Sequence, residues 1–200
     1  MSCISLIVGL GNPGAEYQST RHNAGVWLVE RLAASRNLTF QTEKKFFGLS
    51  ARVEIEGIDV RLLLPTTYMN RSGQSVAAMA SYFQIPVDEI LIVHDELDLD
   101  AGIARFKQGG GPGGHNGVKD IIAYLSGDNG FNRLRIGIGH PGNKERVLGH
   151  VLKRANGDDQ KLIDDAIDAA LDALPMAVRG DIQRAMSQLH TIAPESEPEP

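Results

Sequence analysis

Short apolar runs bounded by glycine, asparagine and proline recur along the chain and predict the strands of a sheet. The run at 3–10 is rich in branched residues and stops at a Gly-Asn-Pro cluster, so we expect it to be a first, central strand. Segments 49–56 and 58–64 flank Gly57 as the arms of a hairpin do, and such an antiparallel pair makes the sheet mixed. The remaining expected strands are 90–94, 103–108 and 133–139.

Apolar residues at helical spacing predict helices between and after these strands. The expected helices are 23–36, 72–84, 117–125, 158–174 and 176–189. We expect Pro175 to separate the last two, because proline lacks the amide hydrogen that a helix interior uses. The tail 193–200 is rich in proline and glutamate without apolar anchors, so we expect it to be disordered.

Composition narrows the class of protein. A length of 200 residues with 42% apolar, 22% charged and 6% aromatic residues indicates one globular domain, over residues 1–192, and excludes disordered and fibrous classes. Cys3, the only cysteine, cannot form an internal disulfide, which together with the lack of a secretory signal fits a reducing cytoplasm. No apolar run approaches the roughly 20 residues that span a bilayer, so we expect no membrane insertion.

The net charge of −5 is unevenly spread along the chain. Residues 101–157 hold 9 basic and 3 acidic residues, whereas residues 1–100 hold 8 and 12, and residues 158–200 hold 3 and 10. The middle segment could therefore form a local basic face, which suits a nucleic-acid partner. Solvated surface lysines and arginines explain the same counts equally well.

Two glycine-rich segments stand beside expected strands. Gly9–Gly14 fits the G-x-G-x-x-G fingerprint of dinucleotide sites, with Glu30 downstream as a ribose ligand. That fingerprint requires a helix to begin inside the turn, and Pro13 with the polar stretch after it favours a plain tight turn. Residues 109–117 hold six glycines without the Lys-Ser/Thr of a P-loop, so their backbone can closely approach another group.

Histidines and acids near these segments are candidates for chemistry. His94 and Asp95 end an expected buried strand, and His22 begins an expected helix. A metal site that combines residues 94–96 with His22 or His115 is disfavoured, because adjacent strand residues point to opposite faces. We interpret the remaining histidines as structural groups: His115, His140, His150 and His190.

Asn12, Asn70 and Asn116 each stand at the end of an expected strand or the start of a helix. Asparagine is common at such turns for conformational reasons alone. These positions can nevertheless converge on one edge of a sheet, where neutral amides suit the binding of peptide N–H and carbonyl groups.

Taken together, these motifs resemble the bacterial peptidyl-tRNA hydrolase family. The matching segments span most of residues 4–155 and are 7–17, 20–25, 65–70, 94–98, 110–117 and 133–141. Two departures are Tyr68, where the family often has phenylalanine, and Arg105, where it usually has lysine. The resemblance implies an α/β fold in a single domain, with a mixed, mostly parallel, twisted sheet flanked by helices on both faces.

The resemblance also implies hydrolysis of the ester between a peptide, or an N-blocked amino acid, and the 3′-terminal ribose of tRNA. His22 is implied as the general base for water and Asp95 as the group that orients it, and we expect Asp95→Asn to cost more activity as the pH falls. Asn70 is implied to hold the attacking water or the peptide, Asn116 the substrate backbone and terminal nucleotide, and Asn12 to distinguish blocked from free amines. No metal, cofactor, serine nucleophile or cysteine nucleophile is implied.

The implied partner is peptidyl-tRNA, bound through its acceptor stem and 3′ CCA end, with the large subunit of stalled ribosomes as a candidate further partner. Tyr17 and Tyr68 are implied to line the substrate site. A cytoplasmic monomer that recycles tRNA from prematurely released peptidyl-tRNA is implied. A phosphate clamp for the acceptor end is expected from two strands and the loop that follows them: Arg105, Lys107, Arg135 and Lys144.

Two other functions stay open on the residues alone. A non-catalytic RNA-binding module would use the basic segment and the glycine-rich loop without chemistry, and turnover of peptidyl-tRNA would distinguish it. A nicotinamide-dependent oxidoreductase would bind a cofactor that a hydrolase lacks.

Overall fold

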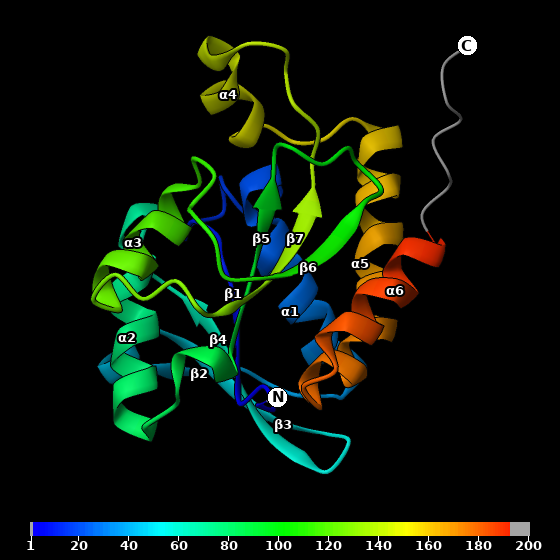
Figure 1. The fold of residues 1–200 in the computed structure, drawn as a ribbon. Helices are drawn as coiled ribbons and strands as arrows, with labels where there is room; N and C mark the ends of the chain where they lie inside the picture. Colours follow the sequence, from blue (N-terminus) through cyan, green and yellow to red (C-terminus); the bar gives the residue numbers. More distant parts are fainter. Residues whose placement is uncertain (1, 193–200) are drawn as a thin grey trace.

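A computed structural model describes residues 2–192 and places their seven strands in one sheet (Figure 1). The strands are β1 (Leu6–Gly9), β2 (Gln41–Glu43), β3 (Gly48–Ile55), β4 (Ile58–Pro65), β5 (Ile90–Glu96), β6 (Ala104–Gln108) and β7 (Asn132–Gly137). Their order across the sheet is β2-β3-β4-β1-β5-β7-β6. The prediction that the first strand is central is therefore confirmed.

The centre of the sheet is parallel and its margins are antiparallel. β1 runs parallel to β4 and β5, and β5 runs parallel to β7, whereas β2, β3 and β6 are added antiparallel at the edges. The predicted hairpin joins β3 to β4 through Glu56 and Gly57, whose φ angles of 53° and 78° are both positive, as a type I′ turn requires. The expected mixed α/β fold is confirmed.

Helices cover both faces of the sheet (Figure 1). The helices are α1 (Ala24–Ser35), α2 (Ser72–Phe83), α3 (Asn116–Tyr124), α4 (Lys144–Val151), α5 (Gly157–Val178) and α6 (Ile182–Ile192), with short 3-10 turns η1 (Arg21–Asn23), η2 (Lys44–Phe46), η3 (Met69–Arg71) and η4 (Val87–Glu89). One apolar cluster packs α1, α5 and α6 against the sheet, and a second packs α2 and α3 against the other face. β5 contributes Leu91 and Val93 to the first cluster and Ile90 and Ile92 to the second, as expected of a strand buried on both sides.

Pro175 does not separate the last two helices, so this prediction is wrong. α5 continues through Pro175 to Val178, and the chain turns at Gly180, whose φ is 88°. Proline removes only its own amide hydrogen bond. Beyond it Ala177 and Val178 are fully buried, and the Val178 carbonyl accepts the N–H of Ile4 at 2.8 Å, so packing keeps the helix intact.

Two elements were not predicted. Residues 144–151 form α4 where we expected a loop, and the Asn143 side chain caps it by accepting the N–H of Arg146 at 3.0 Å. α4 buries only Val151, so it lacks the apolar stripe that signals a helix, and β2 is three polar residues. Within residues 2–192 none of the helices is long and apolar enough to cross a membrane, and the tail 193–200, expected to be disordered, lies outside the described residues.

Candidate active site

The site forms where the central parallel strands end. The segments that follow β1, β4 and β5 meet at the same edge of the sheet, as the carboxyl ends of parallel strands do. α1 packs very closely there, because a Cβ at Gly25 would lie 2.2 Å from the Val93 carbonyl oxygen and 2.7 Å from the Leu10 nitrogen. Only glycine permits this approach, which places η1 and its His22 against the end of β5.

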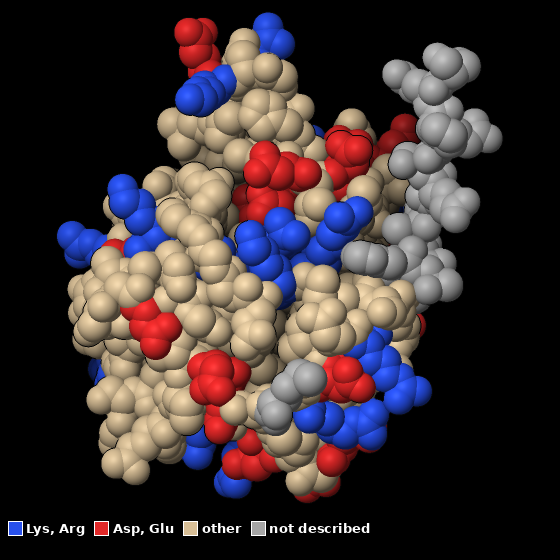
Figure 2. Space-filling view, viewed as in Figure 1, with Lys and Arg blue, Asp and Glu red and all other residues tan. Residues whose placement is uncertain are grey.

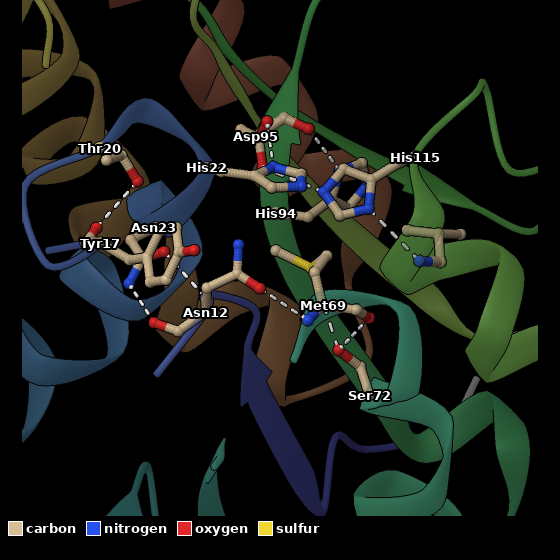
Figure 3. A network of polar contacts seen from close by, with 11 residues as sticks. Asn12, Tyr17, Thr20, His22, Asn23, Met69, Ser72, His94, Asp95 and His115 are labelled. Atoms are coloured by element: carbon tan, nitrogen blue, oxygen red, sulfur yellow. Dashed lines mark hydrogen bonds and ion pairs between the residues drawn. The ribbon is translucent and has the colours of Figure 1, made fainter. Parts of the chain in front are cut away.

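His22 and Asp95 form a buried hydrogen-bonded pair (Figure 3). Nδ1 of His22 lies 2.9 and 3.0 Å from the two carboxylate oxygens of Asp95, and the side chains are 12% and 2% exposed. Nδ1 therefore carries the hydrogen and donates a hydrogen bond to the carboxylate, which leaves the lone pair of Nε2 free to accept a proton.

The carboxylate makes His22 more basic. Burial lowers the pKa of His22, but the charge of Asp95 and its hydrogen bond outweigh burial, and the pKa is raised above the ordinary histidine value. An asparagine at this position would remove the charge and lower that pKa. The expectation that Asp95→Asn costs more activity as the pH falls is therefore wrong.

Asp95 has a second histidine partner, His115, for which only a structural role was expected. Nε2 of His115 lies 3.0 Å from Oδ1 of Asp95, while its Nδ1 accepts the N–H of Val118 at 3.3 Å. These two bonds require the Nε2–H tautomer, so His115 donates to the carboxylate. Burial raises the pKa of Asp95, but the charges and hydrogen bonds of His22 and His115 outweigh it and hold that pKa well below its usual range.

His94 is a third histidine at the site and contacts both Asp95 and His115. Its Nδ1 lies 2.7 Å from the backbone carbonyl of Asp95, and its ring packs edge-on against His115 with 4.8 Å between the centroids. Burial, with the charge of His115, lowers the pKa of His94 to about 3, so the ring is neutral at physiological pH. A metal could use a different set from the one considered above, namely His22, Asp95 and His115, whose ligand atoms lie within 4.8 Å of one another.

Asn12 connects the end of β1 to η3. Its Oδ1 accepts the N–H of Met69 at 2.8 Å, and its own backbone exchanges two hydrogen bonds with the Asn23 side chain, at 2.9 and 3.0 Å. Figure 3 shows the amide nitrogen of Asn12 pointing toward the histidine rings. Asn12 therefore presents a hydrogen-bond donor to the site while its oxygen is already bonded.

A cavity of about 260 Å³ opens beside His22 and Asp95. One wall is the end of the glycine-rich loop with Asn116, and the opposite wall is α4, with Lys144 and the largely exposed Leu148. Lys144 is thus the first residue of a helix beside the cavity, and the expectation that it lies in a loop is wrong.

The side chains of Tyr17, Tyr68 and Asn70 take no part in this hydrogen-bonded network, in which Tyr17 contributes only its backbone carbonyl to Thr20 (Figure 3). Tyr68 is 59% exposed and directly precedes η3, on which Asn70 is exposed beside Met69, while Tyr17 is half-buried in the turn after β1. Within residues 2–192 none of their side chains forms a hydrogen bond. They are free to meet a substrate, and in the described part of the chain none of them forms a hydrogen bond with His22.

Basic side chains gather on β6 and β7. The antiparallel register sets Arg105 opposite Arg135 and Lys107 opposite Arg133, so all four project from one face. Figure 2 shows a group of basic side chains in the middle of the view, with acidic side chains between it and α4. Arg105 and Lys107 are exposed, and Arg135 forms an ion pair with Glu96 at 3.6 Å.

The first glycine motif does not form a dinucleotide site of the usual kind. No helix begins within Gly9–Gly14, because the helix that follows β1 starts only at Ala24. The turn therefore presents no helix N-terminus to a pyrophosphate, as the position of Pro13 predicted.

Comparison with known proteins decides the family. A family profile described as peptidyl-tRNA hydrolase matches residues 6–198. The chain belongs to the peptidyl-tRNA hydrolase family. The peptidyl-tRNA hydrolase of Pseudomonas paraeruginosa is 57% identical over 191 residues, which are 96% of this chain and 98% of the relative. That of Aeromonas hydrophila is 56% identical over 194 residues, or 97% and 98% of the two chains.

Solved structures agree with this assignment. The crystal structure of peptidyl-tRNA hydrolase from Acinetobacter baumannii matches with a TM-score of 0.91 and 57% identity, over 94% of this chain and 95% of that chain. As a peptidyl-tRNA hydrolase, this chain is an enzyme that hydrolyses peptidyl-tRNA and releases tRNA. The resemblance stated from the motifs is confirmed, and the RNA-binding module and the oxidoreductase are set aside.

Proposed function

We propose that His22 is the general base of peptidyl-tRNA hydrolysis and that Asp95 orients it. The observation that carries this proposal is the Nδ1 bond to the carboxylate beside a cavity, which leaves Nε2 as a base. Nε2 takes a proton from water as the water oxygen attacks the ester carbonyl carbon. The tetrahedral intermediate then expels the ribose oxygen, which receives the proton back from His22.

His115 holds Asp95 in this arrangement. By donating to Oδ1 it adds a second hydrogen bond to the buried carboxylate, and buried charges need such partners. Asp95 therefore stays ionised and fixed while His22 gains and loses its proton.

The acyl end of the substrate is bound by asparagines. Asn12 donates through its amide nitrogen to the carbonyl oxygen of the group that blocks the substrate amine. Its own oxygen already accepts the Met69 N–H, so the amide nitrogen is the group of Asn12 that points to the site without a partner among the described residues. Asn70 holds the attacking water or the peptide, and Asn116, on the cavity wall, holds the substrate backbone and the terminal nucleotide.

The tRNA end is held by aromatic and basic side chains. Tyr17 and Tyr68 line the site and stack on the tRNA end or the peptide. The exposed β6 residues Arg105 and Lys107, with Arg135 opposite, contact phosphates of the acceptor stem, and their shared face supports this role. The separate position of Lys144 beside the cavity favours a contact with the 3′ CCA end.

The cellular role follows from the substrate. A protein that releases tRNA from peptidyl-tRNA acts where translation takes place, so we place it in the cytoplasm, where it recycles prematurely released peptidyl-tRNA as a monomer. The large subunit of a stalled ribosome, which carries the same ester, is a second candidate source of substrate.

A hydrolysis assay on N-acetylated aminoacyl-tRNA tests the proposal. Purified protein should release the acyl group without added metal, and a chelator should leave the rate on a minimal 3′-terminal nucleotide ester unchanged. Loss of that activity on chelation, with recovery on added Zn²⁺, would show that His22, Asp95 and His115 hold a metal and would contradict the proton-transfer role of His22.

A further inference from the structure

Arg133 differs from the other basic residues of its sheet face, because its guanidinium is buried against the glycine-rich loop. The residue is 3% exposed, its Nη1 donates to the Gly111 carbonyl at 2.6 Å, and its Nη2 donates to the Gly110 carbonyl. Its guanidinium carbon lies 4.9 Å from the ring centre of Phe131. The side chain thus crosses from β7 to the loop.

The loop needs such an anchor. The glycines of this segment have positive φ, from 59° to 95°, at Gly109, Gly110, Gly113 and Gly114. Glycine loses more conformational freedom on folding than any other residue, so this backbone conformation is only weakly fixed without other contacts. Its ends are fixed by bonds from the Gly109 N–H to the Phe131 carbonyl and from the His115 N–H to the Pro112 carbonyl, both 3.0 Å long. Within residues 2–192 the carbonyls of Gly110 and Gly111 are bonded by Arg133 alone.

Arg133 is poorly placed to bind phosphate. Both Nη atoms are engaged by the loop, Nε is buried without a partner, and no carboxylate of the described chain forms an ion pair with the guanidinium. Burial, together with the charge of Arg135, lowers the pKa of Arg133. Burying a cation without a counter-ion is costly, and the hydrogen bonds to the Gly110 and Gly111 carbonyls compensate for part of that cost.

The loop leads directly into the active site. It ends at His115, which donates to Asp95, and at Asn116, which lines the cavity. Gly117 follows against the site as well, since a Cβ there would lie 2.6 Å from Sδ of Met69. A displacement of the loop would therefore move two groups of the site together.

We propose that Arg133 is a positioning residue for hydrolysis, which acts by fixing the glycine-rich loop so that His115 and Asn116 reach their places. This inference rests on the proposed roles of Asp95 and Asn116. The role of Arg133 thus differs from that of its neighbours Lys107 and Arg135, which we propose to bind phosphates of the tRNA.

Arg133→Met and Arg133→Lys test the inference. Methionine retains length but has no donor, and it should lower kcat by about 10- to 100-fold, the cost of a small misplacement of catalytic groups. The loss should be equal on full N-acetylaminoacyl-tRNA and on the minimal nucleotide ester, with unchanged salt dependence of KM. In Arg133→Met, amide hydrogen exchange over residues 110–117 should accelerate. Arg133→Lys retains a cationic donor, so it should restore part of the lost kcat and part of the protection from exchange. The matched control Arg52→Met, on the exposed β3–β4 hairpin, should behave as wild type.

Two results would overturn the inference. A raised KM for full tRNA alone, with a weaker salt dependence, would make Arg133 a phosphate ligand, and an unchanged kcat with unchanged exchange would show that the loop needs no anchor. If Arg133→Met does not fold by circular dichroism, Arg133→Gln, whose shorter side chain should not hold both loop carbonyls, decides, and wild-type kcat and exchange in that variant would again overturn the inference. Activity in His22→Ala would instead contradict the proposed function itself.

Discussion

Asp95 is central to the proposed chemistry, because its carboxylate accepts hydrogen bonds from two imidazoles. His22 and His115 approach the same oxygen, at 2.9 and 3.0 Å, from segments 73 and 20 residues away in sequence. The first partner could be predicted from a family motif. The second could not, since the path of four positive-φ glycines decides where His115 lies.

The pH dependence of kcat should report this carboxylate. In the wild type the pKa of His22 is raised by Asp95, so the neutral base is lost, and activity falls, as the pH drops through a value above that of an ordinary histidine. In Asp95→Asn the burial that lowers the pKa remains without the charge that raises it. The acidic limb of the kcat profile should therefore move to lower pH, on a lower plateau. A limb that stays in place or moves to higher pH would show that His22 is not the titrating base.

Asn12→Asp replaces the amide donor by a second acceptor oxygen and adds a negative charge, which favours a free ammonium over a blocked amine. The aspartate can still accept the Met69 N–H through one oxygen, so the connection to η3 survives, while the amide nitrogen becomes an acceptor. The preference in kcat/KM for N-acetylated over free aminoacyl-tRNA should fall, by about tenfold or more, because a donor that pairs with the blocking carbonyl is lost. An unchanged ratio between the two substrates would reduce Asn12 to a structural role.

At the scale of elements, α4 forms a wall of the cavity although it packs on little. Arg21, the residue before His22, connects it to the catalytic turn. Its guanidinium donates to the Arg154 carbonyl at 2.9 Å and to the His150 carbonyl at 3.3 Å, and its backbone N–H donates to the Lys153 carbonyl at 3.1 Å. The carbonyls at the C-terminal end of α4 and just after it are thereby held against η1.

Arg21→Met removes the guanidinium donor, and the Arg154 carbonyl then has no other bonded N–H among residues 2–192. We expect a loss of about 1–3 kcal/mol in the free energy of unfolding, and roughly 2–4 °C in Tm for each kcal/mol in a chain of this size. Thermal unfolding followed by circular dichroism measures it. Arg179→Met is the matched control, because its ion pair with Glu56 is exposed and should contribute little. Equal melting of the two variants would mean that α4 is held by other contacts.

The elements that sequence predicted are those whose apolar pattern reflects the core. β1, β5 and the β3–β4 hairpin came from branched runs and a turn, and α1 and α2 from helical spacing. α4 was missed because it buries a single residue, and the break at Pro175 was misplaced because buried residues beyond it outweigh one lost hydrogen bond. The apolar pattern thus predicts the elements that pack into the core and misses α4, which forms a wall of the cavity.

At the scale of the whole molecule, an acidic protein presents a group of basic side chains on one face (Figure 2). The basic residues of β6 and β7 lie near the active site, because Arg135 pairs with Glu96, which lines the cavity. Lys107→Ala and Arg135→Ala should each raise KM for full tRNA and reduce the slope of log KM against log salt by roughly one unit or less per phosphate contact. Arg135 should give the smaller change, because Glu96 already pairs with it. The minimal nucleotide ester serves as control, and losses of the same size on both substrates would contradict a phosphate clamp.

The most direct test of the account is single-turnover hydrolysis of N-acetylaminoacyl-tRNA by His22→Ala, with the exposed His140→Ala as control. Because a general base contributes about 10²- to 10⁴-fold, the rate should fall by that factor while the Kd for tRNA and the Tm stay close to wild type. Near-normal turnover by His22→Ala, in a preparation free of endogenous hydrolase, would contradict the central role given to this histidine.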